Sequence, residues 1–465
     1  MPSPIIYYPE KKEKHGWDEI GMEKIRNGET GAERFGTDSV WRILLHLAPP
    51  VMCSQLIQAL YNIVDSYFVG RCSDEGLTAL SAIYPIQLLA IAVAVGTGVG
   101  VNALMAQEYA AGETRCADRT AGTGLLLALI SWGIFAGIVW VILPGFAAAS
   151  VQSALAAEYT VTYGRIVSVG SLGLFLESLW SKVHQATGNM LRPMAAQITG
   201  AVVNIILDPL LIFGLGPFPE LGIAGAAAAT VAGQVASAVL VGIHGLRRPP
   251  RVWKEFCGYA RNIYRYGIPS IFMQSLYVVY ILALNVILAG FSDAAVTVLG
   301  LYYKLQTFFF IPLFALQTCI VPVLSYNYAS GSWKRCRAVI LDAMILAAVL
   351  MTVGVLAFEG IPGPLIRLFS GNPETLRIGI PAFRIIALSF LPAVLSLIWP
   401  VAFQASRKSL ASMALSLLRQ LVCLLPAFYL FSRIGLAWCW AAFPFAEIVT
   451  ALVGAVLYRR EARKH

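Results

Sequence analysis

Two acidic residues inside long apolar segments are the first candidates for chemistry in this chain. Asp65 is preceded by Gln55, Gln58 and Asn62, at successive spacings of three, four and three residues. This spacing places the four polar side chains on one face of a helix. A polar stripe on an apolar helix favours a position facing a bundle interior or a water-filled cavity rather than lipid.

The second acid, Asp208, follows Asn204 by one helical turn and directly precedes Pro209. Pro209 has no backbone N–H to donate and crowds the carbonyl of Ile205, which frees an acceptor beside the carboxylate. Two carboxylates, an amide and a free carbonyl suit a proton relay or a hard cation such as Na⁺. The alternative interpretation is structural: an aspartate that ties helices together through hydrogen bonds.

Other charges also fall within apolar segments. In the second half of the chain these are Lys304, Asp342, Arg384, Arg419 and Glu447. The favoured interpretation is interhelical ion pairing, for instance of Arg419 with Glu447, and the alternative is that Lys304 lines or gates a cavity. In the first half, Arg165 and Glu177 are expected near the membrane interface or in ion pairs.

The composition explains why these charges stand out. Of 465 residues, 58% are hydrophobic and 13% are charged, and the mean hydropathy is +0.71. Soluble domains carry about 25% charged residues, so a soluble enzyme, a disordered protein and a disulfide-stapled secreted domain are excluded. The sequence shows no nucleotide motif, nucleophile cluster or metal-ligand cluster, and we expect no enzyme activity and no cofactor. Gly96-Thr-Gly98-Val-Gly100 lies inside an apolar segment without a preceding strand and predicts close helix packing.

Twelve apolar segments are long enough to cross a bilayer as helices. They lack the period-two alternation of barrel strands, so the predicted fold is an all-α polytopic membrane protein. The segments are 40–69, 77–107, 118–143, 156–179, 191–213, 222–245, 262–290, 295–328, 337–358, 379–404, 409–431 and 434–458.

Basic residues determine the predicted topology. The net charge is +9, and most Lys and Arg side chains, Lys182 among them, fall in alternate loops and in the C-terminal tail. The opposite loops contain Arg71, Arg367, Arg377 and Arg433. The positive-inside rule then predicts a multi-pass protein of a bacterial plasma (inner) membrane with both termini cytoplasmic. The basic residues are expected to touch lipid headgroups, and nucleic acid is not an expected partner.

The chain also repeats itself. At a separation of 219 residues, Pro50 aligns with Pro269, Gln55 with Gln274, and Tyr84 with Tyr303. Two repeated helical halves are typical of secondary transporters, whose substrates bind where the halves meet. We predict a polar cytoplasmic tail over 1–38, an N-terminal six-helix lobe over 39–245, a basic cytoplasmic linker over 246–261, a C-terminal six-helix lobe over 262–458 and a basic tail over 459–465.

Several stretches together resemble one transporter family, the multidrug and toxic compound extrusion (MATE) family, and within it the bacterial MepA/DinF-like branch. They are the segments 60–71, 188–193, 204–209, 222–230, 303–306 and 325–328. The resemblance covers about residues 38–460 and implies two six-helix lobes and cation-coupled efflux by alternating access.

The resemblance implies a cation site, for H⁺ or Na⁺, at Asp65, Asn204, Asp208 and Thr230. NorM-like members add acids in the seventh and tenth helices, where this chain has Gln274 and no acid, so a second cation site in the C-terminal lobe is not expected. The residues that we expect to line the cavity are Gln55, Gln58, Asn62, Gln274, Lys304 and Gln306.

The implied activity is antiport of amphipathic organic cations by a monomer, driven by H⁺ or Na⁺. One alternative is a flippase for lipid-linked oligosaccharides from the same wider superfamily, which Lys304 and Arg419 keep open. A membrane-embedded enzyme or a receptor would need a reactive cluster or a sizeable soluble domain, and the sequence shows neither.

Overall fold

The computed structural model describes residues 34–463, apart from residues 152, 244, 251, 369–371 and 407. Within these residues the chain is helical and has no strand. The helices of the first half are α1 (Arg34–Thr37), α2 (Val40–Cys72), α3 (Asp74–Ala110), α4 (Thr114–Ser150), α5 (Ala154–Gly170), α6 (Leu172–Ala186), α7 (Leu191–Ile212) and α8 (Ile223–Gly242). Those of the second half are α9 (Trp253–Ala289), α10 (Asp293–Phe309), α11 (Ile311–Ala329), α12 (Trp333–Gly360), α13 (Pro362–Arg367), α14 (Pro373–Ala387), α15 (Phe390–Ala405), α16 (Ser409–Leu417), the π-helical η1 (Leu418–Leu424), α17 (Leu425–Ser432), α18 (Leu436–Cys439) and α19 (Ala442–Ala462).

The predicted all-α membrane fold is confirmed. Eleven helical stretches in the described part are long and apolar enough to cross a membrane, and the count is twelve if the bent pair α14–α15 is one broken span. Many large apolar side chains point outward, including Val141 at 77% and Leu410 at 83% exposure. A soluble monomer rarely exposes such a continuous apolar surface, whereas a bilayer covers it.

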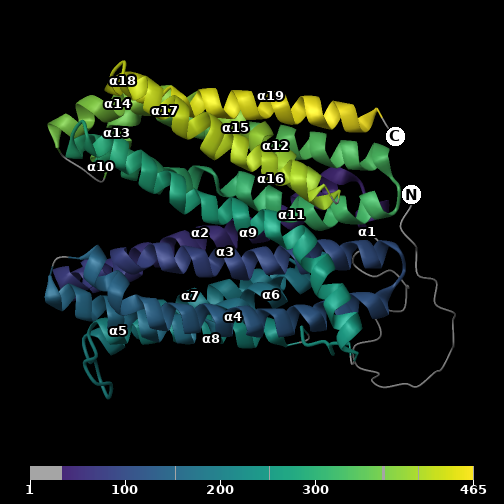
Figure 1. The fold of residues 1–465 in the computed structure, drawn as a ribbon, viewed down its shortest axis with the longest axis horizontal. Helices are drawn as coiled ribbons and strands as arrows, with labels where there is room; N and C mark the ends of the chain where they lie inside the picture. The colour runs from purple at the N-terminus through teal and green to yellow at the C-terminus, as the bar shows by residue number, and fades with distance from the viewer. Residues whose placement is uncertain are drawn as a thin grey trace.

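The helices form two lobes that lie one above the other in Figure 1. Helices α2 to α8 build the lower, N-terminal lobe, and α10 to α19 build the upper, C-terminal lobe. Breaks occur at matching places of the repeat: α5 gives way to α6 at Ser171, and α14 meets α15 at 53° near Ser389. Helix α1 and the C-terminal end of α19 lie at the same end of the bundle (Figure 1), here called the terminal end.

The lobes meet closely near the terminal end, where glycines of α3 pack on α9. A Cβ added to Gly100 would lie 2.3 Å from the carbonyl oxygen of Ile263, and one added to Gly96 would lie 2.7 Å from the backbone nitrogen of Ile271. No larger side chain fits this contact. The predicted close packing of the glycine segment is therefore seen between the lobes.

Buried polar contacts strengthen the same seam. The hydroxyl of Tyr266 on α9 donates to Oε1 of Gln107 on α3 at 2.8 Å, and the Gln404 amide of α15 donates to the Tyr266 carbonyl. Towards the other end the two groups of ribbons diverge (Figure 1). The structure is thus sealed between the lobes at the terminal end.

Two predicted regions and one predicted loop residue differ from expectation. The predicted polar tail over 1–38 includes α1, where Phe35 is 2% exposed and its carbonyl accepts from Asn327 Nδ2 and Arg335 Nε of the C-terminal lobe. Residues 1–33 lie outside the described part. Residues 253–261 of the predicted linker are helical, since they form the first turns of α9, which starts at Trp253. Helix α9 packs against α3 and α4. Lys182, predicted in a loop, lies in α6 and donates to Gln185 Oε1 at 2.9 Å.

The two lobes are filled differently. In the C-terminal lobe aromatic rings pack tightly, as in the stacked pair Phe358 and Phe383 with centroids 4.8 Å apart. In the N-terminal lobe a separate apolar cluster around Val139, Leu143 and Tyr163 is set apart from the larger core that joins both lobes. Residues of both clusters, together with several polar residues, line a cavity in this lobe.

Candidate functional site

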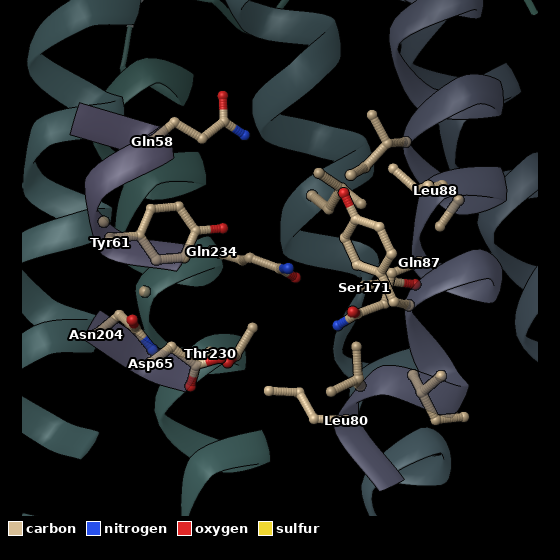
Figure 2. A pocket seen from close by; sticks show the side chains of 18 of the residues that line it. Gln58, Tyr61, Asp65, Leu80, Gln87, Leu88, Ser171, Asn204, Thr230 and Gln234 are labelled. Atoms are coloured by element: carbon tan, nitrogen blue, oxygen red, sulfur yellow. The ribbon is translucent and has the colours of Figure 1, made fainter. Parts of the chain in front are cut away.

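A cavity of about 630 Å³ occupies the interior of the N-terminal lobe. Residues of α2, α3 and α5 to α8 form most of its wall, and Figure 2 shows polar side chains pointing into it from both sides. One part of the wall comes from the other lobe, where Lys304, Thr307 and Phe308 of α10 line it. The cavity therefore touches both lobes, although most of it belongs to one.

Asp65 lies at the cavity wall on α2. It is 7% exposed, and its Oδ1 has no hydrogen-bond partner among the described residues. Figure 2 shows Asp65 beside Asn204 of α7 and Thr230 of α8, all three at the same end of the cavity. The structure thus brings together three of the four residues that the resemblance implies for a cation site.

The fourth, Asp208, lies behind this wall and is fully buried. Its Oδ1 accepts from Asn204 Nδ2 at 3.2 Å, which fixes the amide so that Asn204 Oδ1 faces away without a partner. Asp208 Oδ2 also has no partner in the described part, and the Asp208 carboxyl lies within electrostatic range of Asp65. Packing of α7 against α2 and α8 makes this arrangement.

The unpartnered atoms are all oxygens: one of Asp65, one of Asp208 and one of Asn204. A buried polar atom without a partner is costly, so three such acceptors in one place favour a ligand that supplies positive charge or a proton. Oxygen donors of this kind fit H⁺ and hard cations such as Na⁺. The described residues contain no group of three or more His, Cys, Asp or Glu able to hold a metal ion.

Two tyrosines at this site were missed by sequence reasoning. The Tyr163 hydroxyl on α5 accepts from Gln87 Nε2 at 3.5 Å and lies beside Thr230. Tyr61 lies between Gln58 and Asp65 in Figure 2. The sequence contained a signal for Tyr61, because it continues the stripe Gln58, Tyr61, Asp65 at spacings of three and four; Tyr163 had none.

The other predicted cavity residues divide into three groups. Gln58 and Lys304 line the cavity. Gln55, Gln274 and Gln306 are partly buried but are not among its described lining residues. The side chain of Asn62 lies outside the described part of the chain.

The charges of the C-terminal lobe have mainly structural partners. The predicted pair is present: Arg419 Nη2 lies 2.9 Å from Glu447 Oε1, with the two side chains 16% and 11% exposed. Ser396 donates to the same carboxylate. Asp342 is partly buried, and Arg384 is exposed, so the expectation of a buried partner does not hold for Arg384.

Glu177 departs from expectation as well. It was expected near the interface or in an ion pair, yet it lines the cavity. Its Oε1 accepts from Ser181 Oγ at 2.8 Å, and no ion pair to it is present among the described residues. Sequence alone misjudged it because the predicted span ended at 179, whereas α6 continues to Ala186 and keeps Glu177 inside the lobe.

Comparisons with known proteins identify the family of the chain. A family model described as MatE matches the chain twice, over residues 50–210 and 269–430. The two matches start 219 residues apart, which is the separation of the internal repeat, and together they cover more than half of the chain.

The relatives are transporters. The multidrug export protein MepA of Staphylococcus haemolyticus is 24% identical over 90% of this chain and 93% of its own length. A protein of Shewanella oneidensis named FAD transporter is 23% identical over 90% and 95%. The solved structure of an outward-facing multidrug resistance MATE family transporter has a TM-score of 0.87 at 21% identity, and the match covers 94% of this chain and 98% of that one. The chain therefore belongs to the MatE family of multi-pass membrane transporters.

Proposed function

We propose that this protein is a multidrug efflux antiporter that exchanges H⁺ or Na⁺ for amphipathic organic cations by alternating access. The observation that carries the proposal is the group of unpartnered oxygens of Asp65, Asn204 and Asp208 at the wall of the N-terminal cavity. The name of the relative from Staphylococcus haemolyticus, multidrug export protein MepA, supports the export of drugs.

The coupling follows from where the two ligands bind. A cation that enters from outside binds between α2 and α7, because Asp65 belongs to the first and Asp208 to the second. Its arrival offsets one negative charge of this carboxylate pair and changes the packing of α2 around the cavity. Exchange requires that cation and drug prefer different states of the transporter, and by linkage each lowers the affinity for the other.

The state described here fits the outward-facing half of such a cycle. The seam between α3 and α9 is closed at the terminal end, and under the proposed topology that end is cytoplasmic. The cavity is then reached from the opposite side, where a cation gradient delivers H⁺ or Na⁺.

Dye efflux from proteoliposomes tests the proposal, with H⁺ and Na⁺ gradients imposed separately. Asp65→Asn and Asp208→Asn should each abolish gradient-driven efflux and leave folded protein in the membrane. Asp342→Asn, which changes an intramembrane aspartate away from the cavity, is the matched control and should retain efflux. If Asp65→Asn pumps at the wild-type rate under both gradients, the assignment fails.

A second candidate substrate is an anionic flavin nucleotide. The Shewanella relative is named for FAD, and Lys304 lines the same cavity, where its ammonium suits a phosphate. Adding FAD as a competitor to the efflux assay separates the two candidates. Strong competition that Lys304→Gln removes would favour the nucleotide.

A further inference from the structure

A second polar group lies in the cavity apart from the cation site. It consists of Glu177 on α6, Gln197 on α7 and Gln234 on α8, all three of which line the cavity. The Gln234 side chain projects toward the middle of the cavity in Figure 2. We call these three residues the amide–carboxylate group.

Close helix packing holds this group together. A Cβ on Gly173, one turn before Glu177, would lie 2.8 Å from the carbonyl carbon of Gln234. A Cβ on Gly233 would lie 2.6 Å from the carbonyl oxygen of Gly200, one turn after Gln197. The three helices are therefore in backbone contact around the three polar side chains.

The group has a surplus of acceptors. Oε1 of Gln197 and Oε1 of Gln234 are both buried without a hydrogen-bond partner in the described part of the chain. The Gln197 amide lies beside the Glu177 carboxylate, and Ser181 donates to that carboxylate at 2.8 Å. Lys182, on the next turn, donates to Gln185 Oε1, and its charge acts on the Glu177 carboxylate without a direct contact in the described structure. Two unpaired amide oxygens beside a carboxylate favour a ligand that donates several hydrogen bonds and carries a positive charge.

The amide–carboxylate group is spatially distinct from the cation site. Gln197 precedes Asn204 by seven residues on α7, which is about 10 Å along a helix, and Gln234 follows Thr230 by one turn on α8. Apolar side chains, including Phe135, Val167 and Leu174, also line the cavity and can cover the apolar part of a ligand. The third charged group of the described wall, Lys304, comes from the opposite lobe.

We propose that Glu177, Gln197 and Gln234 form the binding site for the protonated amine of the transported molecule, and that the site selects amines with N–H donors over quaternary ammonium groups. A primary ammonium has three N–H donors and can donate to the carboxylate and to both amide oxygens at once, whereas a secondary ammonium can donate to two of these three acceptors. A quaternary ammonium supplies the charge but no donor, so it leaves both amide oxygens unpaired. This inference rests on the proposed function only in placing the transported molecule in this cavity.

Equilibrium binding to the full-length protein in lipid nanodiscs tests the site without any ion gradient. The probes are dansylcadaverine, a primary amine, and its trimethylammonium derivative, titrated by fluorescence. The wild type should bind the primary amine about 10-fold or more tightly than the quaternary probe, since only the primary amine makes hydrogen bonds between charged groups at this site. Glu177→Gln should remove most of that preference.

Two further variants make the test specific. Gln234→Leu should weaken amine binding several-fold and leave binding of the quaternary probe within about threefold. Glu158→Gln, at an exposed position of α5, is the matched control and should behave like the wild type. Glu177→Gln keeps an acceptor for Ser181, so we expect it to fold, and its thermal midpoint and elution profile check this.

Three outcomes would overturn the proposal: equal binding of both probes by the wild type, no binding of either, or an unchanged preference in folded Glu177→Gln. These outcomes can be told apart from a failure of the proposed antiport. If the antiport proposal fails, efflux does not depend on the ion gradient, while amine binding in nanodiscs still depends on Glu177.

Discussion

The contact between Gly100 and α9 predicts how the transporter can be held open at its terminal end. In Gly100→Ala the new Cβ would lie 2.3 Å from the Ile263 carbonyl oxygen, whereas ordinary contact starts at 3.4 Å. The helices must therefore separate by about 1 Å, or the seam must stay strained. Overpacking of this kind costs about 1–3 kcal/mol, and it acts on the sealed state because the contact joins the two lobes.

The expected shift in the conformational equilibrium follows from that cost. If the sealed state bears all of it, the ratio of sealed to open molecules falls by about 5- to 140-fold. Spin labels on exposed Arg115 of α4 and Lys334 of α12, in a background without other cysteines, report the separation of the lobes near the terminal end. Electron resonance distance measurements should show a longer-distance population in Gly100→Ala.

The control uses a glycine of α9, the helix on which α3 packs at the seam. A Cβ added to Gly258 on α9 meets nothing within 4 Å, so Gly258→Ala should leave the distance distribution of the wild type. An unchanged distribution in folded Gly100→Ala would refute the argument that this contact holds the seal closed.

Three other predictions concern stability and orientation. Arg419→Leu should lower the free energy of unfolding by about 3–5 kcal/mol because Glu447 is left charged and buried. Replacing both residues by Leu should recover most of this loss, as measured by thermal melting. A double variant as unstable as the single one would contradict this. Phe35→Ala should lower the free energy of unfolding by about 3–5 kcal/mol. The control Phe218→Ala, at a site 39% exposed, should melt like the wild type. Equal melting temperatures of the two variants would show that α1 does not anchor the lobe. In single-cysteine variants of intact cells, an impermeant maleimide should label exposed Cys72 but reach exposed Cys257 only after permeabilisation, and the reverse pattern would invert the proposed topology.

The fold was largely predictable because each crossing leaves a long apolar run in the sequence. The segment predicted at 191–213 is observed as Leu191–Ile212, and the segment at 409–431 as Ser409–Ser432 with a π-helical turn inside it. Helix ends were less predictable, as α9 shows: its first turns carry Lys254 and Glu255 and read as a polar linker, yet they continue the helix against α3 and α4.

Residue spacing predicted the site where polar residues share one helix, and the family resemblance added Thr230, which also lines the cavity. Gln58 and Asp65 follow from periodicity on α2, and Asn204 and Asp208 from theirs on α7. Tyr163 and Glu177 were not found, because periodicity identifies the face of a helix but not the helix that it meets. Gln274 and Gln306 were also expected at the cavity, but the C-terminal lobe is packed with aromatic rings and the cavity lies mostly in the other lobe.

The glycine seam has a consequence for synthesis of the chain. The ribosome completes α3 at residue 110, while its partner residues on α9 are made about 160 residues later, which at ordinary translation speeds takes about 10–30 s. Throughout that interval the groove at Gly96 and Gly100 has no helix to fill it. The junction between the lobes is therefore among the last parts to assemble, and a nascent chain stalled before residue 253 presents this groove to the surrounding bilayer.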